Sequence, residues 1–307
     1  MGGRNLKPFL SVYGHVSIDK IISVKEFPRL NTSINVLSKK TNMGGTASNI
    51  SYVAAALGVP TMLCAFIGKD FPHEYRKRLK DAGVMTSGMI ETEYGTSEAL
   101  VVNDRNFDQK VLFYQGPQGW ASKLGIDLSK YAKGSEYVHF STGEPDYYIS
   151  QMEKLKDIPY IAFDPAQEIH EIWDKDRFNR ALALSNIFFC NEHESVSAEK
   201  YIESTLDTIK KHLVVRTDGP EGSRAFIDGK RVDVPAVRPD RVVDTTGAGD
   251  AFRAGFYAAK YRKYGTEEAL IIAAATSSFV IEAYGAVENV PTWDMVMGRA
   301  DNYLRRI

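Results

Sequence analysis

Cysteine is scarce in this chain, and long apolar runs are absent from it. Cys64 and Cys190 are the only cysteines among the 307 residues, and each lies in a short apolar run. These surroundings favour buried free thiols over a disulfide or a cysteine metal site, and they indicate a reducing compartment. The longest nearly apolar stretch, 270–281, is too short to span a bilayer. Because the N-terminus also lacks the apolar core of a secretion signal, we expect a cytoplasmic protein.

An excess of charge of either sign is also missing. The formal net charge is -1, from 38 basic and 39 acidic residues. Nucleic acids and anionic membranes both favour a basic surface. We therefore expect neither a nucleic acid nor a membrane as the partner.

Short apolar runs alternate with helical patterns along the whole chain. The runs are bounded by Gly, Pro or Asp and are too continuously apolar to have a solvent-exposed face, which is typical of a parallel sheet covered on both sides. This alternation indicates a doubly wound α/β sandwich. The sequence predicts strands over 9–13, 61–68, 137–143, 159–165, 186–194 and 212–219. It predicts helices over 46–57, 72–82, 146–155, 174–184, 195–210, 248–263 and 266–283.

Two segments, 19–42 and 96–119, break this alternation. They are polar, carry β-branched residues at alternate positions and show no helical period. These features predict antiparallel hairpins that form a small flap on the main sheet rather than a second domain.

Residues 244–252, DTTGAGDAF, combine small residues, hydroxyls and carboxylates. A P-loop would need a Lys-Ser/Thr pair after its last glycine, and a dinucleotide fingerprint would need a third glycine where Phe252 stands. Neither motif is present. The small residues can instead bring backbone N–H groups close to an anion at the start of a helix. Asp250 then has two open interpretations, as a helix cap or as a functional carboxylate.

Five short motifs occur in register along the chain. They are Gly14 with Asp19, Gly44-Gly45 with Asn49, Asn191 with Glu194, Thr217 with Gly219 and Gly222, and the full signature D-T-x-G-A-G-D from Asp244 to Asp250. With these motifs the chain resembles the ribokinase family of carbohydrate and nucleoside kinases, the PfkB-type kinases, over essentially its whole length. The resemblance implies a ribokinase-like fold: a three-layer α/β/α sandwich with a mostly parallel central sheet and a small β-sheet lid, in a single domain over 1–307.

The resemblance implies a role in phosphoryl transfer for each motif. Asp250 would be the general base for a substrate hydroxyl group, and the backbone of Gly247, Ala248 and Gly249 would be the anion hole. For the acceptor, Asp19 would accept hydrogen bonds from two sugar hydroxyls. Gly44, Gly45 and Asn49 would complete that site.

The remaining motif residues would serve ATP and its metal ion. Asn191 and Glu194 would order Mg²⁺ and its waters, although a helix cap on a surface loop is an open alternative. Backbone at Gly219 and Gly222 would approach the nucleotide, with Thr217 and Thr246 beside it, although a plain turn would also place glycines there. Several members of the family hold K⁺ near the positions of Asp244 and Thr246, and the sequence leaves K⁺ dependence open.

The acceptor is the less constrained substrate. Acid-sugar kinases of the family commonly carry an Arg where Gln167 and Glu168 follow Asp164-Pro165 here, so a carboxylate substrate is disfavoured. The stretches HFSTGEP, FDPAQE and DAFRAGF resemble archaeal-type nucleoside kinases. We therefore expect transfer to the 5'-hydroxyl of a nucleoside. A sugar kinase of the ribokinase, fructokinase or 6-phosphofructokinase type stays open, and a non-catalytic sugar or nucleoside sensor is less favoured.

Two further expectations concern aromatic and imidazole side chains. A base could be covered by Phe113 and Tyr114, or by Phe27 on the other hairpin, although these aromatic rings could equally pack in a dimer interface. We expect a homodimer, because the polar strands at the flap edges need partners and because the resemblance implies one. Four of the six histidines share no metal-ligand spacing with each other or with the cysteines and are interpreted as structural or solvated; they are His15, His139, His170 and His193.

Overall fold

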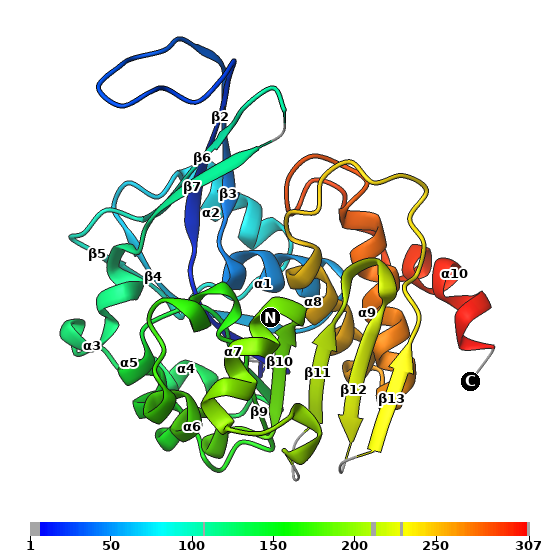
Figure 1. Cartoon of the computed structure of the whole chain (residues 1–307). Helices are drawn as coiled ribbons and strands as arrows, with labels where there is room; N and C mark the ends of the chain where they lie inside the picture. Colours follow the sequence, from blue (N-terminus) through cyan, green and yellow to red (C-terminus); the bar gives the residue numbers. More distant parts are fainter. Residues whose placement is uncertain (1–6, 107, 210–212, 228–229, 306–307) are drawn as a thin grey trace, which may run out of the picture.

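The computed structural model describes residues 7–106, 108–209, 213–227 and 230–305, and a nine-stranded sheet runs through its centre (Figure 1). Seven neighbouring strands are parallel, in the order β11, β10, β9, β8, β1, β4, β5. Their bounds are Leu213–Thr217, Ile187–Asn191, Tyr160–Phe163, Tyr137–Phe140, Leu10–Tyr13, Thr61–Gly68 and Met89–Thr92. An antiparallel hairpin, β12 (Ser223–Ile227) and β13 (Lys230–Val234), extends the β11 edge.

Helices cover both faces of this sheet. Successive residues of one strand point to opposite faces, so that Phe188 and Phe189 of β10 belong to two different buried apolar clusters. One cluster includes residues of α1 (Thr46–Ala56), α2 (His73–Asp81), α8 (Ala248–Tyr261), α9 (Thr266–Val280) and α10 (Trp293–Leu304). The other includes residues of α3 (Ala121–Leu124), α4 (Ser129–Ala132), α5 (Pro145–Lys154), α6 (Lys175–Leu184) and α7 (Glu192–Ile202). The predicted three-layer sandwich with a mostly parallel sheet is confirmed.

A separate four-stranded sheet, here named the lid sheet, projects from the edge of the sandwich (Figure 1). Its order is β3, β2, β6, β7, and its strands are Val36–Gly44, Ser17–Val24, Ser97–Asn103 and Gln109–Tyr114. The pairs β2–β3 and β6–β7 are antiparallel, as the segments 19–42 and 96–119 predict, and β2 pairs with β6 in parallel.

Several predicted boundaries are wrong, for local reasons. The strand predicted over 186–194 ends at Asn191, because the Asn191 side chain caps α7 and starts that helix at once. The helix predicted over 195–210 therefore begins earlier, and it ends at Ile202, where Glu203 takes a left-handed φ of 53°. The described residues do not include Lys210, the last residue of that predicted helix, or His212, the first residue of the strand predicted over 212–219.

Some elements have no counterpart in the prediction. They are β5, β12, β13, α3, α4 and α10. The strand β13 reads KRVDV, with three charged residues, because it is the edge strand of the sheet. Within the described ranges, no helix combines the length and the apolar character that crossing a membrane requires.

Candidate active site

A cavity of about 500 Å³ lies between the carboxyl ends of the parallel strands and the lid sheet. This is the edge at which open α/β sheets bind ligands. Most of the predicted site residues line it: Asp19, Gly45, Asn49, Asn191, Glu194, Thr217, Gly219, Thr246, Gly247, Gly249 and Asp250. Gly44, Gly222 and Ala248 are not among the lining residues, although Gly44 and Ala248 each adjoin one in the chain.

Asp250 lies in the first turn of α8, at the wall of this cavity. Its Oδ2 accepts a hydrogen bond of 2.8 Å from Nδ2 of Asn49, which is on α1. Burial raises the pKa of Asp250 to about 7, against the lowering effects of this hydrogen bond and of the Arg253 charge. The two motifs, 201 residues apart in the chain, therefore meet at one carboxylate.

The predicted anion hole precedes that carboxylate. Gly247 has a left-handed φ of 79°, and a Cβ there would lie 2.6 Å from the Cα of Ala286, so only glycine fits the loop. The Ala248 N–H donates to the carbonyl of Thr245 at 3.2 Å. Of the three amides predicted for the anion hole, this one is engaged within the loop.

Asp19, from β2, lies against the Gly44-Gly45 pair. A Cβ on Gly44 would lie 2.0 Å from Oδ2 of Asp19, and Gly45 has a φ of 97°. The Asp19 carboxylate accepts a hydrogen bond of 2.6 Å from Ser17 Oγ, and burial raises its pKa. The glycine pair thus makes room for a carboxylate in the cavity wall.

Asn191 and Glu194 form a capping box at the start of α7. Asn191 Oδ1 accepts from the Glu194 N–H at 2.8 Å, and Glu194 Oε2 accepts from the Asn191 N–H at 2.8 Å. The pair therefore caps a helix and lines the cavity at the same time. Burial raises the pKa of Glu194 to about 7, and the nearby Asp164 charge adds to this effect.

The predicted ATP residues lie along one rim of the cavity. Thr217 ends β11, and Gly219 begins a single 3₁₀ turn with a φ of 56°. Gly222, with a φ of 100°, packs away from the cavity, where a Cβ would lie 2.2 Å from the carbonyl oxygen of Val234. Its role in this structure is to let the chain turn beside β13.

Two charged residues of the cavity wall were missed by sequence reasoning. Asp164 ends the fourth predicted strand, and both its oxygens accept from Arg253, at 2.7 and 3.3 Å. His139 Nε2 lies 3.4 Å from the same carboxylate. A signal was present, because Arg253 follows Asp250 by three residues and so shares its face of α8.

The histidines differ in position. His139 is buried among aromatic rings, with Nδ1 2.8 Å from the Tyr257 hydroxyl, and His170 contacts Ser197 Oγ at 2.9 Å. His15 instead lines the cavity, 1% exposed. His193 lies in the first turn of α7, after Asn191.

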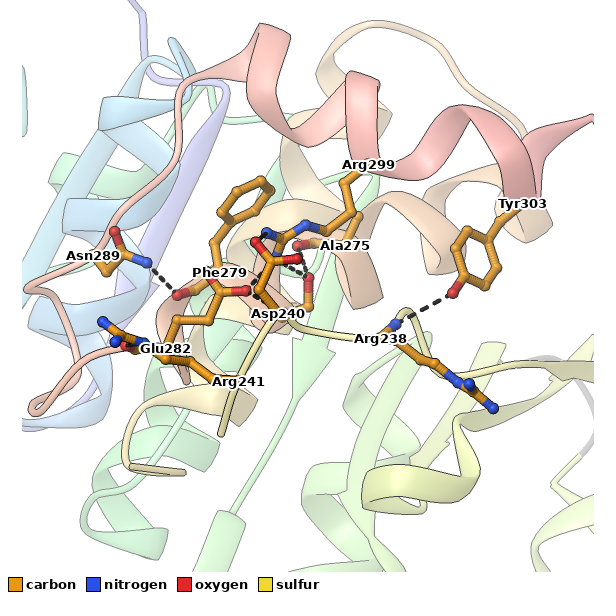
Figure 2. Close-up of polar contacts among 10 residues, drawn as sticks. Arg238, Asp240, Arg241, Ala275, Phe279, Glu282, Asn289, Arg299 and Tyr303 are labelled. Atoms are coloured by element: carbon orange, nitrogen blue, oxygen red, sulfur yellow. Dashed lines mark hydrogen bonds and ion pairs between the residues drawn. The ribbon is translucent and has the colours of Figure 1, made fainter. Parts of the chain in front are cut away.

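A polar cluster behind the anion loop ties three segments together (Figure 2). Arg299 of α10 donates to Ser278 Oγ at 3.0 Å and to Glu282 Oε1 at 2.8 Å, and its guanidinium lies 3.4 Å from the centre of the Phe279 ring. The same Glu282 oxygen accepts from the Asp240 N–H at 2.8 Å. Arg299 and Glu282 therefore hold the end of α9 against the strand-like segment that leads to the anion loop.

That segment reaches the loop through Asp244. Its N–H and that of Val243 donate to the Ile281 carbonyl, at 3.2 and 2.8 Å. The Asp244 carboxylate accepts from the N–H groups of Thr246 and Gly285, both at 2.9 Å. The position of the loop thus depends on contacts that Arg299 supports.

Replacing Arg299 by Met should lower kcat about 10-fold, less than the 10²-fold that a 1 Å misplacement of a reacting group costs. Arg299→Lys should recover only part of this loss, because an ammonium group lacks the planar fork whose Nη1 donates to Ser278 and Glu282 while Nη2 donates to Asp240. Steady-state kinetics and thermal melting of both variants check this prediction. A drop in melting temperature with an unchanged kcat would show that Arg299 only stabilises the fold.

Comparison with known proteins gives a consistent result. Residues 7–293 match the pfkB family of carbohydrate kinases. A nucleoside kinase of Methanocaldococcus jannaschii is 32% identical over 307 residues, 99% of each chain, and one of Thermoplasma acidophilum is 33% identical over 276 residues, 89% of this chain and 90% of that one. The crystal structure of the M. jannaschii nucleoside kinase, an archaeal member of the ribokinase family, has a TM-score of 0.87 at 30% identity and covers 96% of this chain and 99% of that one.

Proposed function

The chain belongs to the pfkB family of carbohydrate kinases, and on this premise we propose that it transfers the γ-phosphate of ATP to the 5'-hydroxyl of a nucleoside. Membership makes it a phosphotransferase with ATP as donor and an alcohol group as acceptor. The names of its full-length relatives favour a nucleoside as that acceptor. The observation that carries the proposal is the meeting of Asn49 and Asp250 in the cavity under the lid sheet.

In the proposed mechanism, the oxygen of the acceptor hydroxyl bonds to the γ-phosphorus, and Asp250 takes the proton of that hydroxyl. The bond between that phosphorus and the β–γ bridging oxygen breaks, and ADP leaves with the electron pair. Asn49 holds the carboxylate through its amide, so that one oxygen is oriented before the acceptor arrives. Asp19, another carboxylate of the cavity wall, grips two adjacent hydroxyls of the sugar.

The loop from Gly247 to Gly249 would stabilise the charge that develops on the transferred group. Two of its residues line the cavity, and the amino end of α8 lies directly behind them. Asn191 and Glu194 would hold Mg²⁺ and its waters through oxygen atoms at the cavity wall, which their mutual hydrogen bonds already orient. Among the described residues, no group of three or more acidic, His or Cys side chains could enclose a metal ion, which fits an ion held mainly by phosphates and waters. When bound, Mg²⁺ neutralises phosphate charge.

Turnover of a panel of acceptors tests the proposed substrate. ADP release should be measured with inosine, adenosine, cytidine, ribose, fructose and fructose 6-phosphate. We expect kcat/KM for the best nucleoside to exceed that for every sugar by at least about 100-fold, because a sugar alone leaves part of the cavity unfilled. Strong turnover of a sugar with none of any nucleoside would favour the sugar-kinase alternative, and no turnover at all would favour the sensor.

The pH dependence of the reaction follows from the position of Asp250. A base must be ionised to accept a proton, and the pKa of Asp250 is raised to about 7. We therefore expect kcat/KM for the acceptor to fall about tenfold per pH unit below pH 7, instead of below the usual aspartate range near pH 4. In Asn49→Ala the acidic limb should move to higher pH, since the hydrogen bond from Asn49 lowers this pKa. An acidic limb near pH 4 in the parent would contradict the assignment.

We also propose a homodimer formed through the lid sheet. Its strands β3 and β7 expose apolar side chains, with Val36 52% exposed, Leu37 55%, Val111 52% and Leu112 66%. Such side chains on the edge strands of a sheet favour pairing with another chain.

Activation by K⁺ beside Asp244 and Thr246 stays a prediction, to be checked by exchanging K⁺ for a bulky organic cation in the assay.

A further inference from the structure

His15 is a buried imidazole in the cavity wall that the proposed mechanism does not use. It follows β1, at the carboxyl end of that strand, and is 1% exposed. Its Nδ1 lies 2.9 Å from Thr142 Oγ1, and that oxygen lies 2.7 Å from Thr46 Oγ1. Its Nε2 is buried and, among the described residues, makes no hydrogen bond of normal geometry, although the Gln115 side chain lies close enough to act on the ring.

An unpaired ring nitrogen of this kind is costly unless a ligand or a water meets it. Burial lowers the pKa of His15, against the raising effect of the nearby Glu168 carboxylate, so the ring is neutral near pH 7. A neutral imidazole has one donor and one acceptor nitrogen. Because Nδ1 is committed to Thr142, Nε2 is the ring nitrogen left without a partner, on a residue that lines the cavity.

The register of the lid sheet shows which part of a substrate would reach it. Asp19 pairs with Ala99, and Ala99 pairs with Phe113, so the three side chains share one face of the sheet. All three line the cavity. Two strand spacings, roughly 10 Å, separate Asp19 from Phe113. A sugar gripped by Asp19 would therefore direct a substituent across Ala99 toward Phe113.

Phe113 and His15 form a corner at that end of the cavity. Their ring centres are 5.1 Å apart and the ring planes meet at 82°. One wall of the corner is an aromatic ring and the other ends in an unpaired nitrogen. A flat heterocycle with polar atoms on its edge matches both walls.

We infer that His15 Nε2 hydrogen-bonds the edge of the nucleobase while Phe113 packs against the base, which makes His15 a residue that selects nucleosides over free sugars. This inference rests on the proposed nucleoside acceptor. It assigns to His15 a ligand-binding role in place of the structural or solvated role that the sequence favours.

The test compares His15→Met with His15→Gln, which are nearly equal in size and differ in polarity. The acceptors are inosine, cytidine and methyl β-D-ribofuranoside, which keeps the 5'-hydroxyl but has no base. In His15→Met we expect KM for the better nucleoside to rise about 10- to 100-fold and KM for the methyl riboside to stay within about twofold. His15→Gln should restore most of the nucleoside affinity, because its amide can reach a similar point.

Equal nucleoside KM values in the two variants would overturn the inference, as would an equal rise for the methyl riboside. A measurement on the parent keeps the inference testable if His15→Met fails to fold. The C-riboside 1-phenyl-β-D-ribofuranose carries a benzene ring in place of the base. Its inhibition constant should be about 10- to 100-fold higher than the dissociation constant of the nucleoside. Equal affinity would overturn the inference.

The two proposals fail in different ways. If the parent phosphorylates the methyl riboside and neither nucleoside, the proposed function is wrong and the role of His15 falls with it. If the parent prefers nucleosides and His15→Met keeps that preference, only the role of His15 is wrong.

Discussion

Asp250→Asn should lower kcat by about 10²- to 10⁴-fold while leaving acceptor binding largely intact. The amide has nearly the same shape as the carboxylate and can still accept the hydrogen bond from Asn49, but it cannot take the proton of the acceptor hydroxyl. ADP release under single-turnover conditions measures the loss, and calorimetric titration with the nucleoside measures binding. An Asn variant that retains more than about a tenth of the parent kcat would contradict the role of Asp250 as the base.

Asp19→Asn is the matched control, because it makes the same chemical change across the same cavity. There we expect KM for the acceptor to rise more than kcat falls, since Asp19 binds hydroxyl groups and takes no proton. Folding can be checked by melting at pH 8. Burial raises the pKa of Asp250 to about 7, so the parent loses stability as the pH rises from about 4 to 7 and carries the whole loss at pH 8, where Asp250→Asn should melt no lower. Equal kcat losses in both variants would remove the distinction between base and binding residue.

Much of the fold could be predicted from the sequence because its central strands are buried on both faces. Runs such as TMLCAFIG leave no alternative to a covered parallel strand, and β4 spans that run, Thr61–Gly68. The edge strands were missed for the opposite reason. β13 has one neighbour and one free edge, so its charged residues carry no strand pattern that a single sequence reveals. Boundaries such as Asn191 depended on a side-chain cap, which a hydrophobic pattern does not show.

The candidate site could be predicted only where small residues or motif spacing reveal it. Gly247 stands out in the sequence as part of the run of small residues before Asp250, and the structure gives the reason, since a side chain there would strike Ala286. His15 carries no such signal, and Arg253 carries only its spacing of three residues from Asp250 on one helix. Each is a polar residue in an apolar stretch, and its place in the cavity depends on strands and helices far away in the chain. Such contacts are properties of the fold, and they appear only when the fold is assembled.

The ion pair between Arg253 and Asp164 is the most deeply buried charge pair of the cavity wall. Their side chains are 6% and 3% exposed. Burial by itself raises the pKa of Asp164, but the Arg253 charge and the contact with His139 outweigh it and leave that pKa below the usual aspartate range. The guanidinium also lies 5.3 Å from the centre of the Phe189 ring and lowers the pKa of Asp250. One arginine therefore favours the ionised form of two carboxylates, and it keeps Asp164 charged, whereas burial still holds the pKa of Asp250 at about 7.

Arg253→Met should lower the free energy of unfolding by about 3–5 kcal/mol at pH 8, because it leaves the Asp164 carboxylate buried without its cation. In the parent, the lowered pKa of Asp164 contributes stability that is present above about pH 4 and is lost below it. In the variant burial dominates and the pKa rises, so protonation relieves the unpaired charge and the difference between the two proteins should shrink from pH 8 to pH 5. The double variant Arg253→Met with Asp164→Asn should recover part of the loss, since it removes the stranded charge. Urea unfolding of all three proteins at both pH values measures these free energies of unfolding. If Arg253→Met loses as much free energy of unfolding at pH 5 as at pH 8, lost packing and not the unpaired carboxylate is the cause.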